Sequence, residues 1–326
     1  MNFYTLIARI VSLGLLLAAA GPGIAQQPYP SKPVRYIIPY PPGGSTDPMG
    51  RMIAARLTER WGQQVIVDNR PGGNTVIGTE FLSRANPDGY TIGWASAAFF
   101  STPSLIPNLP YDTFRDFAGV TTIGKSRIVL VLHPSVPANN LQDLIALVKS
   151  KPGQFNFGSS GVGTNTHLSG ELFNQVTGAK VIHIPYKGSG PVTTDLLGGR
   201  VEMSFQVPIT VIPFINAGRL KPIAVSGETR LPALAQVPTF TEAGLPNGGL
   251  TGITGIIAPA KSPYPAISRI AREVAAILAM PSTQEFMARQ GAEPFTSTPE
   301  QTNAIIKDEV ARYAKIIKGA GITHQP

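Results

Sequence analysis

Residues 34–49 read Val34-Arg-Tyr-Ile-Ile-Pro-Tyr-Pro-Pro-Gly-Gly-Ser-Thr-Asp-Pro-Met49. The apolar run Val34–Ile38 predicts a strand, and the Pro- and Gly-rich residues 39–45 predict a turn. A helix is expected over 48–61 with Asp47 as its N-cap, because proline favours the first helical position and apolar residues recur every four positions. A strand, a glycine-rich turn and a helix in this order indicate an α/β fold.

The same alternation of strands and helices continues toward the C-terminus. Short apolar runs predict strands at 64–67, 90–94, 128–132, 155–157, 181–184 and 201–205. Helical periodicity predicts helices at 141–150, after Thr166, and at 191–197, 265–280 and 299–318. This alternation predicts helices layered on mainly parallel sheets, and a length of 326 residues suggests two domains.

Two short segments of the sequence resemble each other. Ile38-Pro-Tyr-Pro-Pro-Gly43 recurs as Ile184-Pro-Tyr-Lys-Gly188, each time between a predicted strand and a predicted helix. The similarity suggests two lobes that present comparable loops, although a chance match of short sequences is the alternative. Ligands of open α/β sheets bind at the carboxyl ends of strands, so these loops are candidate ligand contacts.

Two loops rich in glycine and hydroxyl side chains precede predicted helices, at 41–47 and 158–166. Backbone N–H groups at a helix N-terminus have no helical partner, and together with the helix dipole they favour a carboxylate or phosphate. An ordinary capped turn is the alternative for the first loop. The second loop approaches the dinucleotide-binding fingerprint, but Thr166 replaces its last glycine and no acidic residue near position 185 follows to hold a ribose.

Composition and missing motifs argue against several classes of function. The chain has 27 Lys and Arg against 19 Asp and Glu, a net charge of +8, but its cations form no dense patch of the kind that binds nucleic acid. It has no cysteine, which excludes disulfides, thiolate metal sites and cysteine nucleophiles. No HExxH motif or P-loop occurs, and Gly158-Ser-Ser-Gly-Val162 lacks the last glycine of a nucleophile elbow.

Residues 1–25 have the pattern of a secretory signal peptide. Arg9 precedes the apolar run 10–20, and Gly23-Ile-Ala25 places small residues at the −3 and −1 positions of a cleavage site after Ala25. A membrane anchor is the alternative, but this apolar run is shorter than the roughly 20 residues that a spanning helix needs. Export to the periplasm is therefore expected.

A series of ordered motifs extends from Tyr29 to Ile322. They are Tyr29-Pro-x-Lys-Pro-Val-Arg35, Pro42-Gly-Gly-Ser-Thr-Asp47, Gly62-Gln-Gln-Val65, Asp68-Asn-Arg-Pro-Gly72, Pro87-Asp-Gly-Tyr90, Leu109-Pro-Tyr-Asp112, His133-Pro-Ser-Val-Pro137, His167-Leu-Ser-Gly-Glu-Leu-Phe173, Ile184-Pro-Tyr-Lys-Gly188, Asp195-Leu-Leu-Gly-Gly199 and Val237-Pro-Thr-x-x-Glu-Ala-Gly244. With these motifs the sequence resembles the extracytoplasmic solute receptors of tripartite tricarboxylate transporters, the Bug family.

This resemblance implies a type II periplasmic-binding-protein fold, in which two α/β lobes enclose a ligand cleft and two hinge crossings join them. The first lobe would contain 26–124 and 225–326, and the second 125–224. Related receptors bind small carboxylates and serve the membrane components of a tripartite transporter or a sensor. A monomer without catalytic residues, cofactor, metal or nucleic-acid partner is expected. An exported hydrolase or lyase acting on a small organic acid is the alternative.

The ligand contacts are expected in the two helix-start loops and in a few residues near them. The predicted ligand-binding residues are Tyr40, Gly43, Gly44, Ser45, Thr46, Asp47, Ser96, Ser159, Ser160, Gly163, Thr164, His167, Tyr186 and Gln206. The carboxylate of Asp47 is expected to cap its helix and orient the first loop rather than touch an anion.

Two departures from the family pattern bear on the ligand. Gln206 stands where many relatives have Asp, which removes a negative charge from the expected site. Residues 95–100 are more apolar than the sequence common there in the family. We therefore expect a dicarboxylate with an apolar body, and an aromatic body if Phe99 and Phe100 face the cleft rather than the core.

Protein recovered from an exporting cell is expected to begin at Gln26, because signal peptidase cuts after a small residue such as Ala25. Intact-mass measurement or N-terminal sequencing checks this. An exported protein that still carries Met1 would contradict it.

Overall fold

The computed structural model describes residues 29–246 and 248–322, and the elements below lie within 32–322. The signal-peptide prediction falls outside the described residues. The strands are β1 Val34–Ile38, β2 Val65–Asn69, β3 Thr91–Ala95, β4 Phe117–Ser126, β5 Val129–Leu132, β6 Asn156–Ser159, β7 Ile182–Pro185, β8 Met203–Gln206, β9 Lys221–Val225, β10 Gly252–Pro259 and β11 Ala292–Pro294. The helices are α2 Asp47–Trp61, α3 Val76–Ser83, α4 Ala97–Leu105, α5 Leu141–Ser150, α6 Asn165–Thr177, α7 Ser189–Leu197, α8 Pro208–Asn216, α9 Tyr264–Leu278, α10 Pro281–Arg289 and α11 Pro299–Gly319.

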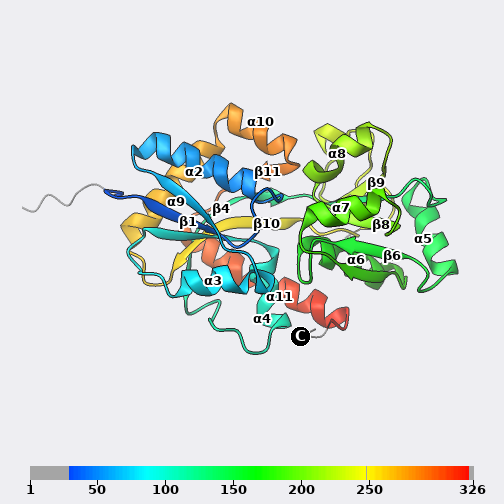
Figure 1. The fold of residues 1–326 in the computed structure, drawn as a ribbon, viewed down its shortest axis with the longest axis horizontal. Coiled ribbons are helices and arrows are strands. Elements are labelled where there is room, and N and C mark those ends of the chain that lie inside the picture. Colours follow the sequence, from blue (N-terminus) through cyan, green and yellow to red (C-terminus); the bar gives the residue numbers. More distant parts are fainter. Residues whose placement is uncertain (1–28, 247, 323–326) are drawn as a thin grey trace, which may run out of the picture. The chain divides into compact units, whose positions relative to one another are not determined.

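The described strands form two sheets, shown in Figure 1 with helices on both faces of each. The first sheet has the order β11-β4-β10-β3-β1-β2, and the second has the order β7-β6-β8-β5-β9. The chain enters the second sheet between β4 and β5 and leaves it after β9, so residues 129–225 supply every strand of that sheet. Because β4 continues to Ser126, it runs two residues into the predicted second lobe. The lobe boundaries themselves stay a prediction.

The expectation of mainly parallel sheets was wrong, because both sheets are mixed. β1 runs parallel to β2 and β3, and β6 runs parallel to β7 and β8. In contrast, β10 is antiparallel to β3 and β4, and β5 is antiparallel to β8 and β9. The antiparallel strands β4, β5, β9 and β10 flank the two crossings between the sheets. At these crossings the chain passes to the other sheet, whereas parallel strands of one sheet are connected through a helix. The strand-helix rhythm therefore predicted only the parallel strands at the outer part of each sheet.

Helix α2 begins one residue earlier than expected. Thr46 is the N-cap and Asp47 is already helical, with Pro48 next to it. The helix ends at Gly62, whose φ of 65° lies in the left-handed region that glycine adopts at no steric cost. The predicted apolar spacing is confirmed, because Met49, Ile53 and Leu57 are all buried.

Side-chain alternation along β5 explains how the second sheet is covered on both faces. Leu130 and Leu132 belong to an apolar cluster with residues of α5 and α6, whereas Val129 and Val131 belong to a cluster with residues of α7 and α8. Successive residues of a strand point to opposite faces, so one short apolar run supplies two cores. Gly170 lets α6 come close to β6, because a Cβ there would lie 2.2 Å from a ring carbon of Phe157.

Helix α6 also packs against helices α4 and α11, which lie against the first sheet. Leu168 is fully buried in the cluster that contains Phe99 and Phe100 of α4 and Tyr313 of α11. The carbonyl oxygen of Gly163, just before α6, accepts a hydrogen bond of 2.8 Å from the hydroxyl of Ser101 in α4. The two sheets are thus joined by side-chain packing as well as by the chain crossings.

Arg127 lies at one crossing, between β4 and β5, and its side chain is 2% exposed. Its guanidinium donates to the carbonyl oxygens of Ser226 and Thr229, which follow β9 at the other crossing. It also pairs with Glu293 in β11. A single buried cation therefore ties both crossings to the edge strand of the first sheet.

Within 29–246 and 248–322, the structure contains no helix that is long and apolar enough to cross a membrane.

Replacing Arg127 with Met is expected to lower the free energy of unfolding by about 1–3 kcal/mol, because the carbonyl oxygens of Ser226 and Thr229 lose their charged donor. Urea unfolding measures the change, with Arg84→Met as a matched control. The side chain of Arg84 is 71% exposed and, within the described residues, its one ion pair is with Glu80, so its loss should change stability by less than about 0.5 kcal/mol. Equal effects of the two substitutions would contradict the prediction.

Candidate functional site

A pocket of about 310 Å³ lies at the carboxyl ends of strands from both sheets. Its walls come from the segments that follow β1, β3, β6, β7 and β8, together with parts of β4, β10 and β11. The lining residues are Tyr40, Pro41, Pro42, Gly43, Gly44, Ser45, Thr46, Met49, Trp94, Ser96, Ala97, Ser126, Ser160, Thr164, Asn165, Thr166, Lys187, Gly188, Ser189, Gly190, Pro191, Val207, Gly252, Ile253, Thr254, Gln290 and Ala292. This is the position at which open α/β sheets bind ligands.

The first loop presents backbone donors from the start of α2. The N–H groups of Gly44, Ser45 and Thr46 make no hydrogen bond within the described residues, and all three residues line the pocket. Gly43 has a φ of 75°, so its backbone takes a turn that L-residues rarely adopt. The result is a set of N–H groups at the positive end of a helix dipole.

Asp47 holds this loop from behind and does not line the pocket. Its carboxylate accepts the N–H of Gly43 at 3.1 Å, Nε of Arg51 at 2.8 Å and the amide of Asn69 at 3.1 Å. Burial alone would raise the pKa of Asp47, but these three donors together hold it below its usual value. An ionised Asp47 therefore orients the loop.

The second loop is more strongly bonded to itself. The N–H of Ser160 donates to Oγ1 of Thr166 at 2.9 Å, and the N–H of Gly161 donates to Oγ of Ser159 at 3.2 Å. Thr164 is the N-cap of α6, and its side chain accepts the N–H of His167. Within the described chain, the N–H groups of Asn165 and Thr166 remain without an acceptor, and both residues line the pocket.

The charge of the pocket favours an anion. Of its lining residues, Lys187 is the one with a charged side chain, and no lining residue is Asp or Glu. Lys187 is exposed and makes no ion pair with the described part of the chain. Hydroxyl groups surround the two helix starts, among them Tyr40, whose oxygen lies 2.7 Å from Oγ of Ser96. Burial raises the pKa of Tyr40 to about 12, against the smaller lowering effect of Ser96, so its hydroxyl stays protonated at neutral pH.

Eight of the predicted ligand-binding residues line this pocket: Tyr40, Gly43, Gly44, Ser45, Thr46, Ser96, Ser160 and Thr164. Six others do not: Asp47, Ser159, Gly163, His167, Tyr186 and Gln206. Ser159 and Gly163 belong to the second loop but are buried away from the pocket, and His167 lies in α6 beneath the loop. The hydroxyl of Tyr186 donates to Asp195 at 2.8 Å, away from the lining residues.

Gln206 is fully buried, and its side chain is already bonded inside the protein. Its Nε2 donates to Oγ of Ser204 at 2.7 Å, and its Oε1 accepts from Oγ1 of Thr210 at 3.3 Å. The next residue, Val207, lines the pocket instead. An amide here supports the loop after β8 without placing a charge beneath the pocket.

Phe99 and Phe100 belong to the core and do not face the pocket. Each is 2% exposed. Phe99 meets Phe117 edge-on with ring centroids 5.4 Å apart, and Phe100 stacks on Tyr313 at 6.2 Å. Helix α4 turns both rings inward, so the expectation that they stack on an aromatic ligand loses its support.

Several lining residues were not predicted, notably Lys187, Asn165 and Thr254. Lys187 lies inside the repeated segment 184–188, so the repeat carried a signal for it. Asn165 follows the predicted Thr164 at the start of α6. Thr254 comes from β10, which is far from both loops in sequence and showed no local sign of a site.

A larger groove of about 700 Å³ lies near the opposite, amino ends of β1 and β3. It contains several cations, but each has a carboxylate nearby. Arg70 pairs with Asp68 at 2.9 Å and Lys32 pairs with Asp88 at 3.1 Å. The charges of this groove are thus satisfied within the chain, which makes it a weaker candidate for an anion site.

His167, Glu171 and His183 are close enough together to be considered as metal ligands. The N–H of Gly163 donates to Nδ1 of His167 at 3.0 Å, so the ring proton must lie on Nε2, the nitrogen nearest Glu171. The two imidazole rings are stacked with centroids 3.9 Å apart and planes inclined by 23°. The lone pairs of the ring nitrogens lie in the ring planes. Because the two planes are stacked, these lone pairs do not converge on one ion. The residues do not fit a metal centre.

Comparison with known proteins identifies the family. The model of the tripartite tricarboxylate transporter family receptor matches residues 49–322. Protein BugT of Bordetella pertussis is 36% identical over 325 residues, which cover 98% of this chain and 99% of BugT. The structure of a periplasmic transporter matches with a TM-score of 0.84 and 35% identity, covering 90% of this chain and 99% of that one. The structure of R. palustris Rpa4515 with adipate matches with a TM-score of 0.85 and 33% identity, covering 91% and 100%.

These similarities confirm the predicted fold, which is that of a periplasmic binding protein. They also overturn the alternative of an exported hydrolase or lyase, because the matching family consists of receptors. The chain belongs to the tripartite tricarboxylate transporter family of receptors, which includes the Bug proteins, and it is a solute-binding protein of periplasmic transport rather than an enzyme.

Proposed function

We propose that this receptor captures a small aliphatic dicarboxylate in the pocket at the two helix starts. The observation that carries the proposal is the combination of unpaired backbone donors with a lining that contains one lysine and no carboxylate. Such a site lowers the free energy of a bound anion and offers no partner to an ammonium group.

One carboxylate would lie against the N–H groups of Gly44, Ser45 and Thr46, with those of Asn165 and Thr166 opposite. The second would lie toward Lys187, which belongs to the segment between β7 and α7. Met49, Trp94, Val207 and Ile253 supply apolar lining for the carbon chain between the two charges. A pocket of about 310 Å³ suits a small organic acid.

A relative supports this class of ligand, since Rpa4515 has been solved with adipate, a six-carbon aliphatic dicarboxylate. An aliphatic body is favoured over an aromatic one here because Phe99 and Phe100 lie in the core. The mature receptor would be a periplasmic monomer beginning at Gln26. It would deliver its ligand to the membrane components of a tripartite transporter or to a sensor, as the family implies.

Isothermal titration calorimetry at low salt should rank adipate above hexanoate and above 2-aminoadipate by at least about tenfold in affinity. Hexanoate lacks the second charge, and the ammonium of 2-aminoadipate finds no carboxylate in the pocket. Tighter binding of the neutral adipamide than of adipate would overturn the proposed ligand class.

Lys187→Met is expected to weaken adipate binding by about 1.5–3 kcal/mol, because one charged hydrogen bond is lost. Hexanoate affinity should change much less if its single carboxylate occupies the helix starts. Lys180→Met is the matched control, since Lys180 is also exposed but lies outside the pocket. Equal affinities of the Lys187 and Lys180 variants for adipate would contradict a contact between Lys187 and the ligand.

A further inference from the structure

We propose that His167 and His183 are positioning residues, which hold the second ligand loop in its binding shape from behind. This loop is defined here as residues 159–166. The proposal assigns a role to one buried imidazole, that of His167, and one partly buried imidazole, that of His183, neither of which lines the pocket. The affinity test below rests on the proposed function, whereas a second measurement does not.

His167 fixes the middle of the loop through Gly163. The N–H of Gly163 donates to Nδ1 of His167 at 3.0 Å, and the carbonyl oxygen of Gly163 accepts from Ser101 at 2.8 Å. The N–H and the carbonyl oxygen of Gly163 therefore both have hydrogen-bond partners. Gly163 has a φ of 73°, so the loop needs a glycine at this point and depends on outside bonds to hold it there.

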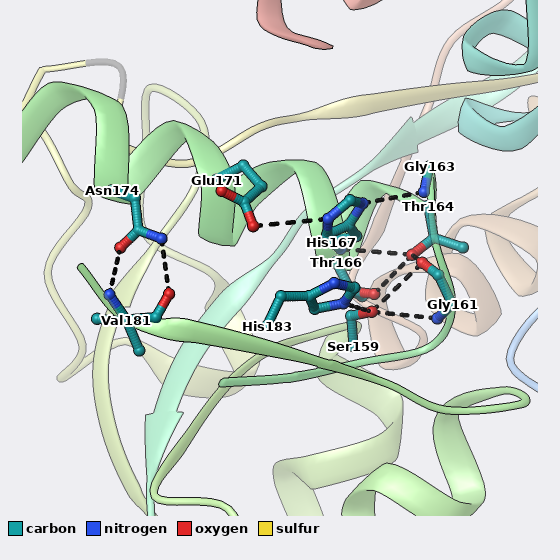
Figure 2. Close-up of polar contacts among 10 residues, drawn as sticks. All are labelled: Ser159, Gly161, Gly163, Thr164, Thr166, His167, Glu171, Asn174, Val181 and His183. Carbon is teal, nitrogen blue, oxygen red and sulfur yellow. Dashed lines mark hydrogen bonds and ion pairs between the residues drawn. The ribbon is translucent and has the colours of Figure 1, made fainter. Parts of the chain in front are cut away.

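His183 fixes the beginning of the loop through Ser159. Its Nε2 lies 2.6 Å from Oγ of Ser159, which in turn accepts the N–H of Gly161 at 3.2 Å. Figure 2 shows the two rings stacked one above the other, with His167 directed at Gly163 and His183 directed at Ser159. Of the loop residues that line the pocket, Ser160 lies between these two anchor points in the sequence, and Thr164, Asn165 and Thr166 follow Gly163 directly.

The rings themselves are held in place by stacking. His183 lies 3.9 Å from His167 and 4.9 Å from Phe157, measured between ring centroids. A backbone N–H can only donate, so Nδ1 of His167 must keep its lone pair and the ring must be neutral. Burial lowers the pKa of His183 to about 3, so this ring is also neutral. Two neutral acceptor-bearing rings can stack where two cations would repel.

Paired substitutions separate the positioning role from general stability. Asn places an oxygen near the position of Nδ1, so His167→Asn keeps an acceptor for Gly163, whereas His167→Leu removes it. Gln reaches the position of Nε2, so His183→Gln keeps a partner for Ser159, whereas His183→Leu removes it. We expect each Leu variant to weaken adipate binding about tenfold, and the Asn and Gln variants to recover most of this loss.

The matched control is Asn174→Leu. Asn174 is also on α6, but its side chain exchanges two hydrogen bonds with Val181, at 2.9 and 3.1 Å, far from the ligand loop (Figure 2). This variant should lower the unfolding temperature as the Leu variants do, while leaving the affinity for adipate unchanged. A comparable loss of affinity in Asn174→Leu would show that stability alone explains the effect and would overturn the proposal.

Amide hydrogen exchange of the ligand-free protein supplies the second measurement. Peptides covering 159–166 should exchange faster in His167→Leu and His183→Leu than in the wild type, and near the wild-type rate in the Asn and Gln variants. Unchanged exchange in both Leu variants would overturn the positioning role. If wild-type protein fails to bind adipate while exchange follows this pattern, the proposed ligand is wrong and the positioning role stands.

Discussion

Backbone N–H groups at the start of a helix have no acceptor within that helix. The candidate site depends on the positions of such N–H groups at the starts of two helices. In the loop that leads into α2, the donors of Gly44, Ser45 and Thr46 remain open to the pocket, because Asp47 binds the loop at Gly43 instead of capping them. In α6 the side chain of Thr164 satisfies one donor and leaves two. The donors that the pocket offers to an anion are therefore mainly main-chain groups, which cannot change protonation.

These backbone N–H groups can point into the pocket together only if the loops that contain them keep their shape. Asp47 supports the first loop by three hydrogen bonds, while the imidazoles of His167 and His183 contact the second. Asp47 and His167 are buried and His183 is partly buried, whereas the polar side chains facing the pocket are largely hydroxyls and amides. The carboxylate of Asp47 stands behind the first loop and neutral imidazoles stand behind the second, so the pocket itself remains free of carboxylates.

Local signals in the sequence predicted the parts of the structure that depend on neighbouring residues. The strand, turn and helix over 34–61 were foreseen because proline, glycine and apolar spacing act within a few positions. The antiparallel placement of β10 between β3 and β4 was not, since strand pairing over more than a hundred residues leaves no local mark. The lobe boundaries and the ligand contacts stay predictions.

The direction of individual side chains limited the prediction of the site. Gln206 and Val207 are adjacent, yet only Val207 reaches the pocket, and sequence alone does not reveal which of two neighbours turns inward. His167 stands at a helix start that looked accessible, but its ring lies beneath the loop. Phe99 and Phe100 offered a plausible contact with ligand until α4 placed both in the core. Lys187, which the sequence does not distinguish from other surface lysines, is the lining residue with a positively charged side chain.

The chain order of the first sheet has a consequence for how the receptor is made. Both ligand loops have been synthesised by residue 166, but β10, at 252–259, must still be inserted between β3 and β4. Tyr313 of α11, in the last turns of the chain, then stacks on Phe100 and reaches Asn165 at the start of α6. A growing polypeptide thus carries the complete sequence of both pocket-lining loops through about half of its synthesis before it can assemble them into a pocket.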